Sequence, residues 1–375
     1  MLQHFSDKTP LVKWVQTILA SSALLLCTAA VPVQPQVRLS VMYNDAADLF
    51  SLMDNVSGWL DGFTDPAYRS EWVQRFGWSA ADQAWVVRYR EYRLRTFVDD
   101  SQGLDPATSP DGIFAARSSN TAVSDPLAAF FMSQTNIRTA LAGLDRSIAP
   151  KDAKMLRGFY AHFTPKWRVL LAESKPLVAK AAELDRTFDA DRVTTFVARM
   201  SRFYGVGVDG RFTVFFTRFP PGKRSSAEVV AGEYVLLHSP PGADADMGWD
   251  MIVMHELAHY ISARQSSQQK KALTARFFGR CQAPSAVRRL WLLEEPLAVA
   301  WGQATYSAKV RDRPLDPKDN WYAIPWIDIV SRTIAPSLSA AYETNATIMD
   351  GIADEAADRC KDLTAIASMT NAATK

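Results

Sequence analysis

The sequence predicts a mostly helical α+β protein with one small sheet. Apolar residues recur at helical spacing through most of the stretch between residues 44 and 203. The period then changes, because residues 212–217 and 228–237 are rich in β-branched and aromatic side chains and lie on either side of a Pro-Pro-Gly turn at 220–222. Helical patterns return after residue 246. A long helical region, a short sheet and a second helical region are therefore expected in that order.

Composition sets the first limits on function. The chain has 375 residues, of which 48% are hydrophobic and 22% charged, as is typical of a folded globular protein. Its 42 Lys and Arg side chains are balanced by 40 Asp and Glu side chains. Because no strong field of one sign surrounds such a chain, composition favours neither nucleic acid nor an anionic bilayer as a partner. We expect no nucleic-acid partner.

Residues 1–30 differ from the rest of the chain. Lys8 and Lys13 precede the apolar run 14–26, and the small residues Thr-Ala-Ala follow at 28–30. This order is that of a secretory signal peptide. The run is too short and too polar to span a bilayer comfortably, although an uncleaved signal anchor is the alternative. We predict cleavage near Ala30, export to the periplasm or the extracellular space, and no stable membrane span after removal of the signal.

The three cysteines follow from this prediction. Cys27 leaves with the signal peptide, so the mature chain keeps Cys281 and Cys360. Two cysteines in an oxidising compartment favour a single disulfide. We therefore predict a bond between Cys281 and Cys360.

Several elements are expected before residue 205. Residues 37–41 predict a short strand, and residues 44–60 predict a helix with one apolar face. Ser79 and Asp82 form a capping box, which marks the start of another helix. The arginines of that helix are expected to lie in solvent: Arg88, Arg90, Arg93 and Arg95.

The next stretch, residues 99–125, is rich in Asp, Ser, Pro and Gly and predicts a long loop or linker. Helical patterns follow at about 125–145, at 152–184 with a break near Pro165, and at 189–203. We divide the mature chain into a mostly helical N-terminal region, 37–205, and a second region, 206–375, which begins with the two strands.

One motif carries chemistry. A helix is expected from about Trp249 to Ile261, capped by Asp246 or Asp250, and it contains His255 and His259. On a helix, residues four apart share one face and lie about 6 Å apart, so both imidazoles can reach one tetrahedral ion. Glu256 is rotated by about 100° from His255 and is placed to take a proton from a metal-bound water. We predict a Zn²⁺ site with Glu256 as its general base.

The alternative is two surface histidines on a helix beside a chance glutamate. Two observations favour the metal site. The chain holds 5 histidines and two of them fall in this motif. In addition, every residue between Ile252 and Ile261 outside the three chemical positions is uncharged, which is typical of a helix buried against a sheet.

The run His255-Glu256-Leu257-Ala258-His259-Tyr260 resembles the zincin superfamily of metallopeptidases. The metzincin branch requires Gly where Ser262 stands and His where Gln265 stands, so that branch is excluded. The gluzincin branch takes its third ligand from a glutamate on a later helix, and the run 291–298, Trp-Leu-Leu-Glu-Glu-Pro-Leu-Ala, is similar to that pattern.

This resemblance implies that Glu295 is the third zinc ligand. Pro296 stands where the family usually has glycine, and a residue before proline is pushed away from helical geometry. Glu295 is therefore expected at the very start of its helix. In that case, the alternative is that Glu294 is the third ligand.

The resemblance covers about residues 210–305 and leaves the N-terminal region unassigned. It implies a zincin-like catalytic domain over 206–375 and an exported zinc metallopeptidase acting on peptides or proteins. It also implies that residues 229–238 form an edge strand that pairs with extended substrate. Three residues are candidate donors to the oxyanion: Tyr306, Tyr322 and His238.

Two other functions stay open. The first is a non-catalytic binding protein that keeps a zincin fold, and Glu256 argues against it because a structural zinc site has no need of that carboxylate. The second is a zinc amidase acting on cell-wall peptide, which the same ligand set would serve equally well.

Overall fold

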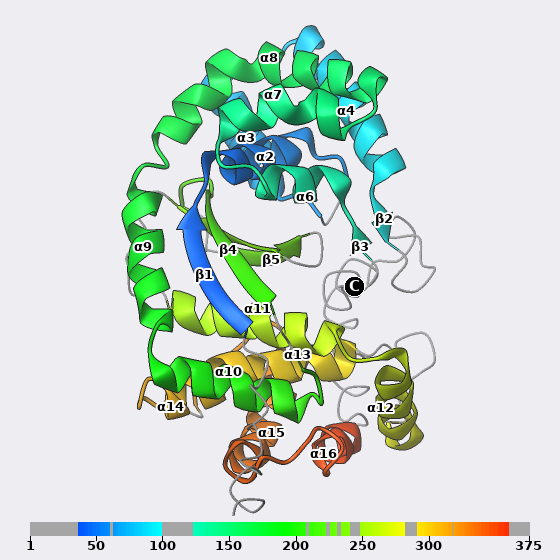
Figure 1. Cartoon of the computed structure of the whole chain (residues 1–375), viewed down its shortest axis with the longest axis vertical. Coiled ribbons are helices and arrows are strands. Elements are labelled where there is room, and N and C mark those ends of the chain that lie inside the picture. Colours follow the sequence, from blue (N-terminus) through cyan, green and yellow to red (C-terminus); the bar gives the residue numbers. More distant parts are fainter. Residues whose placement is uncertain are drawn as a thin grey trace, which may run out of the picture. The chain divides into compact units, whose positions relative to one another are not determined.

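The computed structural model describes residues 37–60, 63–99, 123–207, 210–222, 226–230, 234–240, 248–281, 291–316 and 318–359. Its centre is a four-stranded mixed sheet in the order β1-β4-β6-β5 (Figure 1). Three strands are parallel to one another: β1 (Val37–Tyr43), β4 (Gly210–Arg218) and β6 (Tyr234–Ser239). The fourth strand, β5 (Ser226–Val230), is antiparallel to β6 and forms an edge of the sheet.

Helices cover both faces of this sheet. What we call the first face is covered by the helices between β1 and β4 that lie earliest in the chain (Figure 1). They are α2 (Asp45–Ser57), α3 (Pro66–Phe76), α4 (Ala80–Thr96), α6 (Pro126–Met132), α7 (Ile137–Ser147) and α8 (Pro150–Ala172). Their apolar side chains form one hydrophobic cluster with Phe215 and Leu236 of the sheet. Two short strands, β2 (Val98–Asp99) after α4 and β3 (Val123–Ser124) before α6, pair as an antiparallel ribbon.

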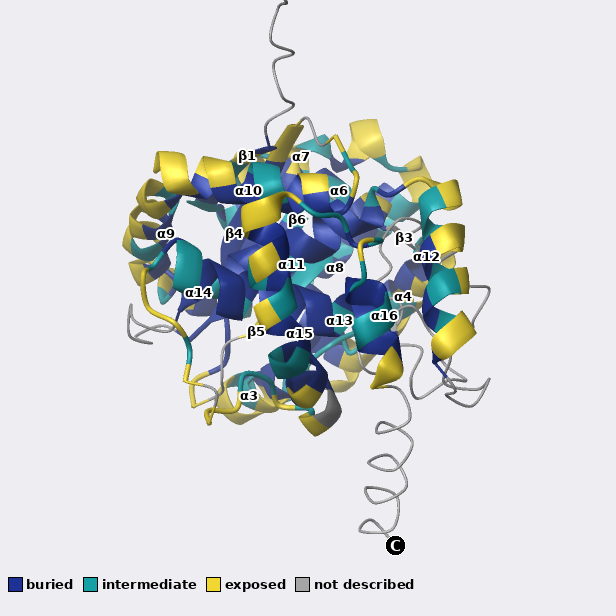
Figure 2. Ribbon diagram, turned by 90° about the horizontal axis from the view of Figure 1, so that it is seen from below, coloured by how far each residue is buried: buried dark blue, intermediate teal, exposed yellow. Residues whose placement is uncertain are grey.

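The second face is covered by the remaining helices, which form a separate hydrophobic cluster with Val214, Val235 and Leu237 of the sheet. They are α9 (Pro176–Phe188), α10 (Asp191–Phe203), α11 (Trp249–Ala263), α12 (Ser267–Arg280), α13 (Trp291–Val299), the π-helix η3 (Ala300–Thr305), α14 (Tyr306–Lys309), α15 (Pro325–Thr344) and α16 (Ile352–Asp358). In Figure 2, α9 and α12 show exposed turns at the sides, whereas no residue of α11 is exposed. The helix with the histidine motif therefore lies inside the second layer.

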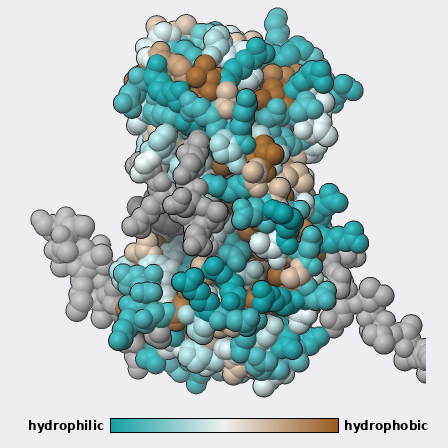
Figure 3. Space-filling model, turned by 90° about the vertical axis from the view of Figure 1, so that its left-hand side faces the viewer, coloured by the Kyte–Doolittle hydropathy of each residue, from teal (hydrophilic) through white to brown (hydrophobic). Residues whose placement is uncertain are grey.

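The predicted mostly helical α+β class is confirmed, and its small sheet is the four-stranded one, beside which the described residues also form the two-stranded ribbon β2–β3. The described residues belong to one compact unit, and the sheet joins the two regions expected on either side of residue 205, because β1 pairs in register with β4. Among the described helices, none combines the length and the apolar character needed to cross a bilayer. The face seen in Figure 3 is mostly hydrophilic, with apolar groups in small separate patches.

Local signals predicted several elements well. The strand expected at 37–41 is β1, and the helix expected at 44–60 is α2, whose N-cap Asn44 accepts a hydrogen bond from the amide of Ala46 at 2.8 Å. The Ser79–Asp82 capping box is present at the start of α4. Each of these features depends on residues close together in the sequence.

Three expectations about elements were wrong. The break expected near Pro165 does not occur, since α8 continues through this proline and ends only at Ala172. Buried Phe163 and Trp167, one on each side of the proline, anchor α8 in the core and outweigh the lost hydrogen bond. The segment expected as one strand at 228–237 is two strands, β5 and β6, and of these two only β5 lies at an edge of the sheet.

The third error concerns the arginines of α4. Arg93 is not in solvent but buried, and its guanidinium binds the carboxylates of Asp54 and Asp125. Tertiary packing decides this, because α4 presents Arg93 to α2 and to the start of α6.

Some predictions fall on residues outside the described ranges. These are the signal peptide at 1–30, Asp246, Cys360 and most of the loop at 99–125. Cys281 is buried and disulfide-bonded. Its pairing with Cys360 stays a prediction.

Candidate metal centre

Helix α11 holds the histidine motif at the centre of the second layer. Its N-cap is Gly248, which has a positive φ of 67° and makes no side-chain cap. The expected cap by Asp250 is therefore wrong. Asp250 lies in the first turn, where its negative charge interacts favourably with the helix dipole. Its carboxylate pairs with Arg311 at 3.5 Å.

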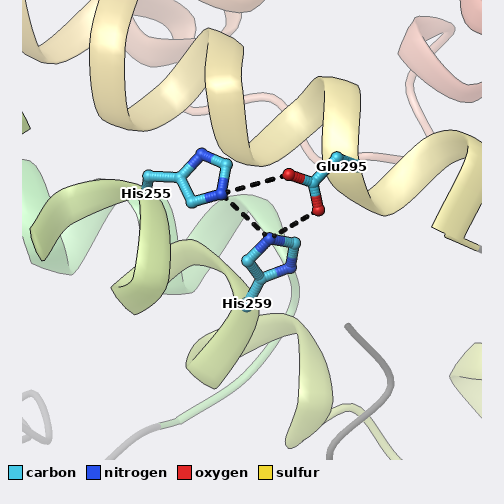
Figure 4. Close-up of side chains that lie close together, drawn as sticks. All are labelled: His255, His259 and Glu295. Atoms are coloured by element: carbon cyan, nitrogen blue, oxygen red, sulfur yellow. Dashed lines mark hydrogen bonds and ion pairs between the residues drawn. The ribbon is translucent and has the colours of Figure 1, made fainter. Parts of the chain in front are cut away.

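Three side chains converge on one point (Figure 4). The Nε2 atoms of His255 and His259 lie 3.2 Å apart, and Glu295 faces both of them from α13. Its Oε1 lies 3.3 Å from Nε2 of His255, and its Oε2 lies 3.1 Å from Nε2 of His259. His255, His259 and Glu295 form a group that can hold a metal ion.

Both imidazoles are buried, with 7% exposure for His255 and 5% for His259. Within the described part of the chain, the Nδ1 atom of each ring has no hydrogen-bond partner. A buried polar atom without a partner costs free energy, so the two rings are not explained as ordinary core histidines that satisfy their own hydrogen bonds.

The electrostatics favour a cation at this point. Burial lowers the pKa of His259, but the carboxylate of Glu295 beside it raises the pKa to about 9. Burial likewise raises the pKa of Glu295, and the two imidazoles outweigh this and hold it well below its ordinary value. Both shifts show a carboxylate that stabilises positive charge between these side chains.

The two adjacent glutamates have different surroundings. Glu295 meets the histidines, whereas Glu294 turns toward Ser262, whose hydroxyl donates to Glu294 Oε1 at 3.4 Å. Glu294 is 4% exposed, and burial raises its pKa to about 7. The geometry therefore places Glu295, and not Glu294, among the candidate ligands.

The expectation that Glu295 begins its helix was wrong. Helix α13 begins at Trp291 and contains Pro296 in its interior, so Glu295 is already helical. The proline removes a single backbone hydrogen bond, and the packing of buried Leu293 and Leu297 on either side keeps the helix intact.

A close helix contact supports His255, and sequence reasoning missed it. The π-helix η3 packs against α11 at Gly302. A Cβ atom added to Gly302 would lie 2.2 Å from the backbone N of His255 and 2.4 Å from its Cα. Only glycine fits here. A glycine inside an apolar helical pattern was the available signal, because such a glycine often marks a close packing contact.

Glu256 lies on α11 between the two histidines and is half-buried. Its carboxylate contributes to the raised pKa of His259, so it lies within electrostatic reach of the ligand cluster. Glu256 therefore lies near the group that can hold a metal ion.

The three oxyanion candidates separate clearly. The ring of Tyr322 lies nearly parallel to that of His255, with 6.2 Å between centroids and 14° between planes. Tyr306 is buried instead beside Phe196 and Asp250. His238 lies on the first face, because side chains alternate along β6 and Leu236 belongs to the first cluster. Tyr322 is thus the candidate that the fold brings to the site.

No protein-family model, curated protein or solved structure matches this chain. The chemistry of the site therefore has to be read from its residues. Two imidazoles and one carboxylate are ligands that suit a divalent transition metal, and a carboxylate next to them suits proton transfer.

Proposed function

We propose that this protein is an exported zinc-dependent metallopeptidase. The observation that carries the proposal is the convergence of three side chains: the Nε2 atoms of His255 and His259 lie 3.2 Å apart, and they lie 3.3 and 3.1 Å from the two different carboxylate oxygens of Glu295. In a tetrahedral zinc site with bonds of about 2.0–2.1 Å, neighbouring ligand atoms lie about 3.3 Å apart. The separation of the two imidazole nitrogens is close to this spacing, and Glu295 would supply a third ligand, which leaves the fourth position for water.

Each residue has a distinct role in the proposed reaction. Zinc, when bound, supplies a water of lowered pKa and polarises a substrate carbonyl. His255, His259 and Glu295 hold the ion. Glu256 accepts the proton of the water and passes it to the leaving amine. The resemblance of the 255–260 run to zincins supports the same assignment.

The edge of the sheet supports a peptide as substrate. The outer edge of β1 is covered by α9, because Asp185 accepts the amide of Val41 at 2.6 Å. Strand β5 forms the opposite edge and contacts α11. An extended peptide can add to such an edge strand through backbone hydrogen bonds, which would bring its amide groups toward the motif helix.

A peptide library separates this proposal from its two alternatives. The wild-type protein with zinc should cleave peptides, and Glu256→Gln should keep its zinc while losing a factor of about 10² to 10⁴ in kcat. Glu183→Gln, at an exposed glutamate on α9, is the matched control and should behave as wild type.

Other outcomes would assign the protein differently. Cleavage of cell-wall amides with no cleavage of peptides would indicate the zinc amidase. Stoichiometric zinc without hydrolysis of either substrate would indicate a binding protein. Equal turnover by Glu256→Gln and wild type would contradict the role of Glu256.

A further inference from the structure

A buried aspartate organises the segment that carries Tyr322. Asp328 lies in the first turn of α15 and is 3% exposed. Its Oδ1 accepts the amide hydrogen of Trp321 at 2.7 Å and that of Tyr322 at 3.2 Å. Its Oδ2 pairs with Arg332 one turn along the helix. Both oxygens are therefore engaged, and one of them fixes two consecutive backbone amides.

The same segment has a second attachment. The indole N–H of Trp321 donates to the carbonyl oxygen of Asp316 at 3.1 Å. Asp316 also accepts the amide of Lys318 at 2.8 Å through its own carboxylate, but this bond is exposed. The buried Asp328 therefore binds the backbone of Tyr322 itself, whereas the carboxylate of Asp316 binds a backbone amide elsewhere in the same loop.

Tyr322 in turn lies against a candidate metal ligand. Its ring is nearly parallel to the imidazole of His255, and Nδ1 of that imidazole has no hydrogen-bond partner among the described residues. In metal sites, the second ring nitrogen usually donates to a carboxylate or a carbonyl, and this bond sets the orientation of the ring. For His255, the neighbouring ring of Tyr322, with its centroid 6.2 Å away, is a described group that can limit the rotation of the imidazole.

We propose that Asp328 is a positioning residue of the metal centre: it holds Tyr322 against His255 and so restricts the rotation of this ligand. An effect of this restriction on peptide hydrolysis rests on the proposed function. Its effect on metal binding does not, because that effect requires only the group that can hold an ion.

Four variants test this chain of contacts. Asp328→Ala removes both backbone contacts, and Asp328→Asn keeps an acceptor oxygen while losing the charge. Tyr322→Ala removes the ring, and the double variant closes a thermodynamic cycle. Asp316→Ala is the matched control, because it removes an aspartate-to-amide bond in the same loop without touching Tyr322.

The first measurement is the rate at which each zinc-loaded protein releases zinc to a chelator. We expect release about 10-fold faster for Asp328→Ala and Tyr322→Ala, by analogy with other contacts that orient metal ligands. We expect Asp328→Asn to lie close to wild type, and the double variant to release no faster than Tyr322→Ala. Amide hydrogen exchange at Trp321 and Tyr322 should accelerate in Asp328→Ala and not in Asp316→Ala.

The proposal is overturned if the effects of Asp328→Ala and Tyr322→Ala multiply in the double variant, since Asp328 would then act independently of the ring. Unchanged zinc release in Tyr322→Ala also overturns it, even where Asp328→Ala does not fold. A wild type that binds zinc and cleaves no peptide would refute the proposed peptidase, while the release rates would still decide the role of Asp328.

Discussion

The two faces of the sheet each bury histidine beside glutamate, and they do so in opposite ways. On the first face, His238 has a partner at both ring nitrogens. Its Nδ1 lies 2.8 Å from the hydroxyl of Thr217, and its Nε2 lies 3.2 Å from Glu228. On the second face, the Nε2 atoms of His255 and His259 point at each other and at Glu295, while both Nδ1 atoms lack partners in the described structure.

Charge balance shows the same contrast. On the first face, the carboxylates of Asp54 and Asp125 already have a permanent cation beside them, because both pair with the guanidinium of Arg93. On the second face, the carboxylates of Glu295, Glu256 and Glu294 all raise the pKa of His259. Carboxylates that pair with a permanent cation of the chain need no other cation, whereas carboxylates gathered around imidazoles form a group that can hold a metal ion.

The largest effect should come from removing the third ligand. Glu295→Ala leaves two imidazoles and should weaken zinc binding by about 100-fold or more, because a carboxylate bond to the ion is lost. Glu294→Ala should keep its zinc, since Glu294 contacts Ser262. Zinc content after dialysis checks both variants, and retention in Glu295→Ala with loss in Glu294→Ala would reverse the assignment.

The next effect tests the support behind His255. Gly302→Ala places a methyl group against the backbone of His255 and should lower the free energy of unfolding by about 1–3 kcal/mol or more. Zinc affinity should fall as well. Gly279→Ala is the matched control, because a Cβ there meets no atom within 4 Å and lies in α12, where alanine favours the helix. Equal stability of Gly302→Ala and wild type in chemical denaturation would contradict the close contact.

A third prediction isolates the first face. His238→Gln should bind zinc as wild type does, because His238 lies on the opposite side of the sheet from α11. It should lower the free energy of unfolding by about 1–3 kcal/mol, as hydrogen bonds to Thr217 and Glu228 are disturbed. Urea unfolding and zinc titration measure the two effects. A loss of zinc binding in His238→Gln with unchanged stability would contradict the claim that only the second face binds metal.

The smallest effect concerns pH and a carboxylate of the first face. Burial raises the pKa of Asp82, but bonds from Lys166 and the amide of Ser79 outweigh it and lower the pKa to about 2. A depressed pKa stabilises the fold above the unfolded value near 4, and this contribution disappears as the pH falls toward 2.

The stability lost in Asp82→Asn should therefore be about 1 kcal/mol near neutral pH, because solvent screens part of these interactions, and it should shrink between pH 4 and pH 2. Unfolding of both proteins at a series of pH values checks this. A difference that stays constant, or grows in acid, would show that Asp82 acts without its charge.

Local patterns predicted much of the fold and two of the three candidate metal ligands. The spacing of His255 and His259 sufficed to place both imidazoles together, because one helical turn separates them. Capping residues and apolar periodicity placed α2 and α4 for the same reason. Glu295 required more, since its pairing with α11 crosses 36 residues of sequence, and only the resemblance to a known pattern pointed to it.

The remaining features depend on tertiary packing. No local signal distinguishes Arg93, which is buried, from Arg95 of the same helix, which is exposed. Tyr322 lies near His255 and Tyr306 does not, and the loop that carries Tyr322 is held by a buried aspartate six residues further along the chain. The order of β5 and β6 follows from long-range pairing, which a hydrophobic pattern cannot specify by itself.

The central claim is that one zinc ion is held by His255, His259 and Glu295. X-ray absorption at the zinc edge of the purified mature protein tests it most directly. The account predicts one zinc per chain with nitrogen and oxygen ligands at about 2.0–2.1 Å and the outer scattering of two imidazoles, and loss of that signal in Glu295→Ala. Sulfur in the first shell, scattering from no more than one imidazole, or the absence of stoichiometric zinc would contradict it.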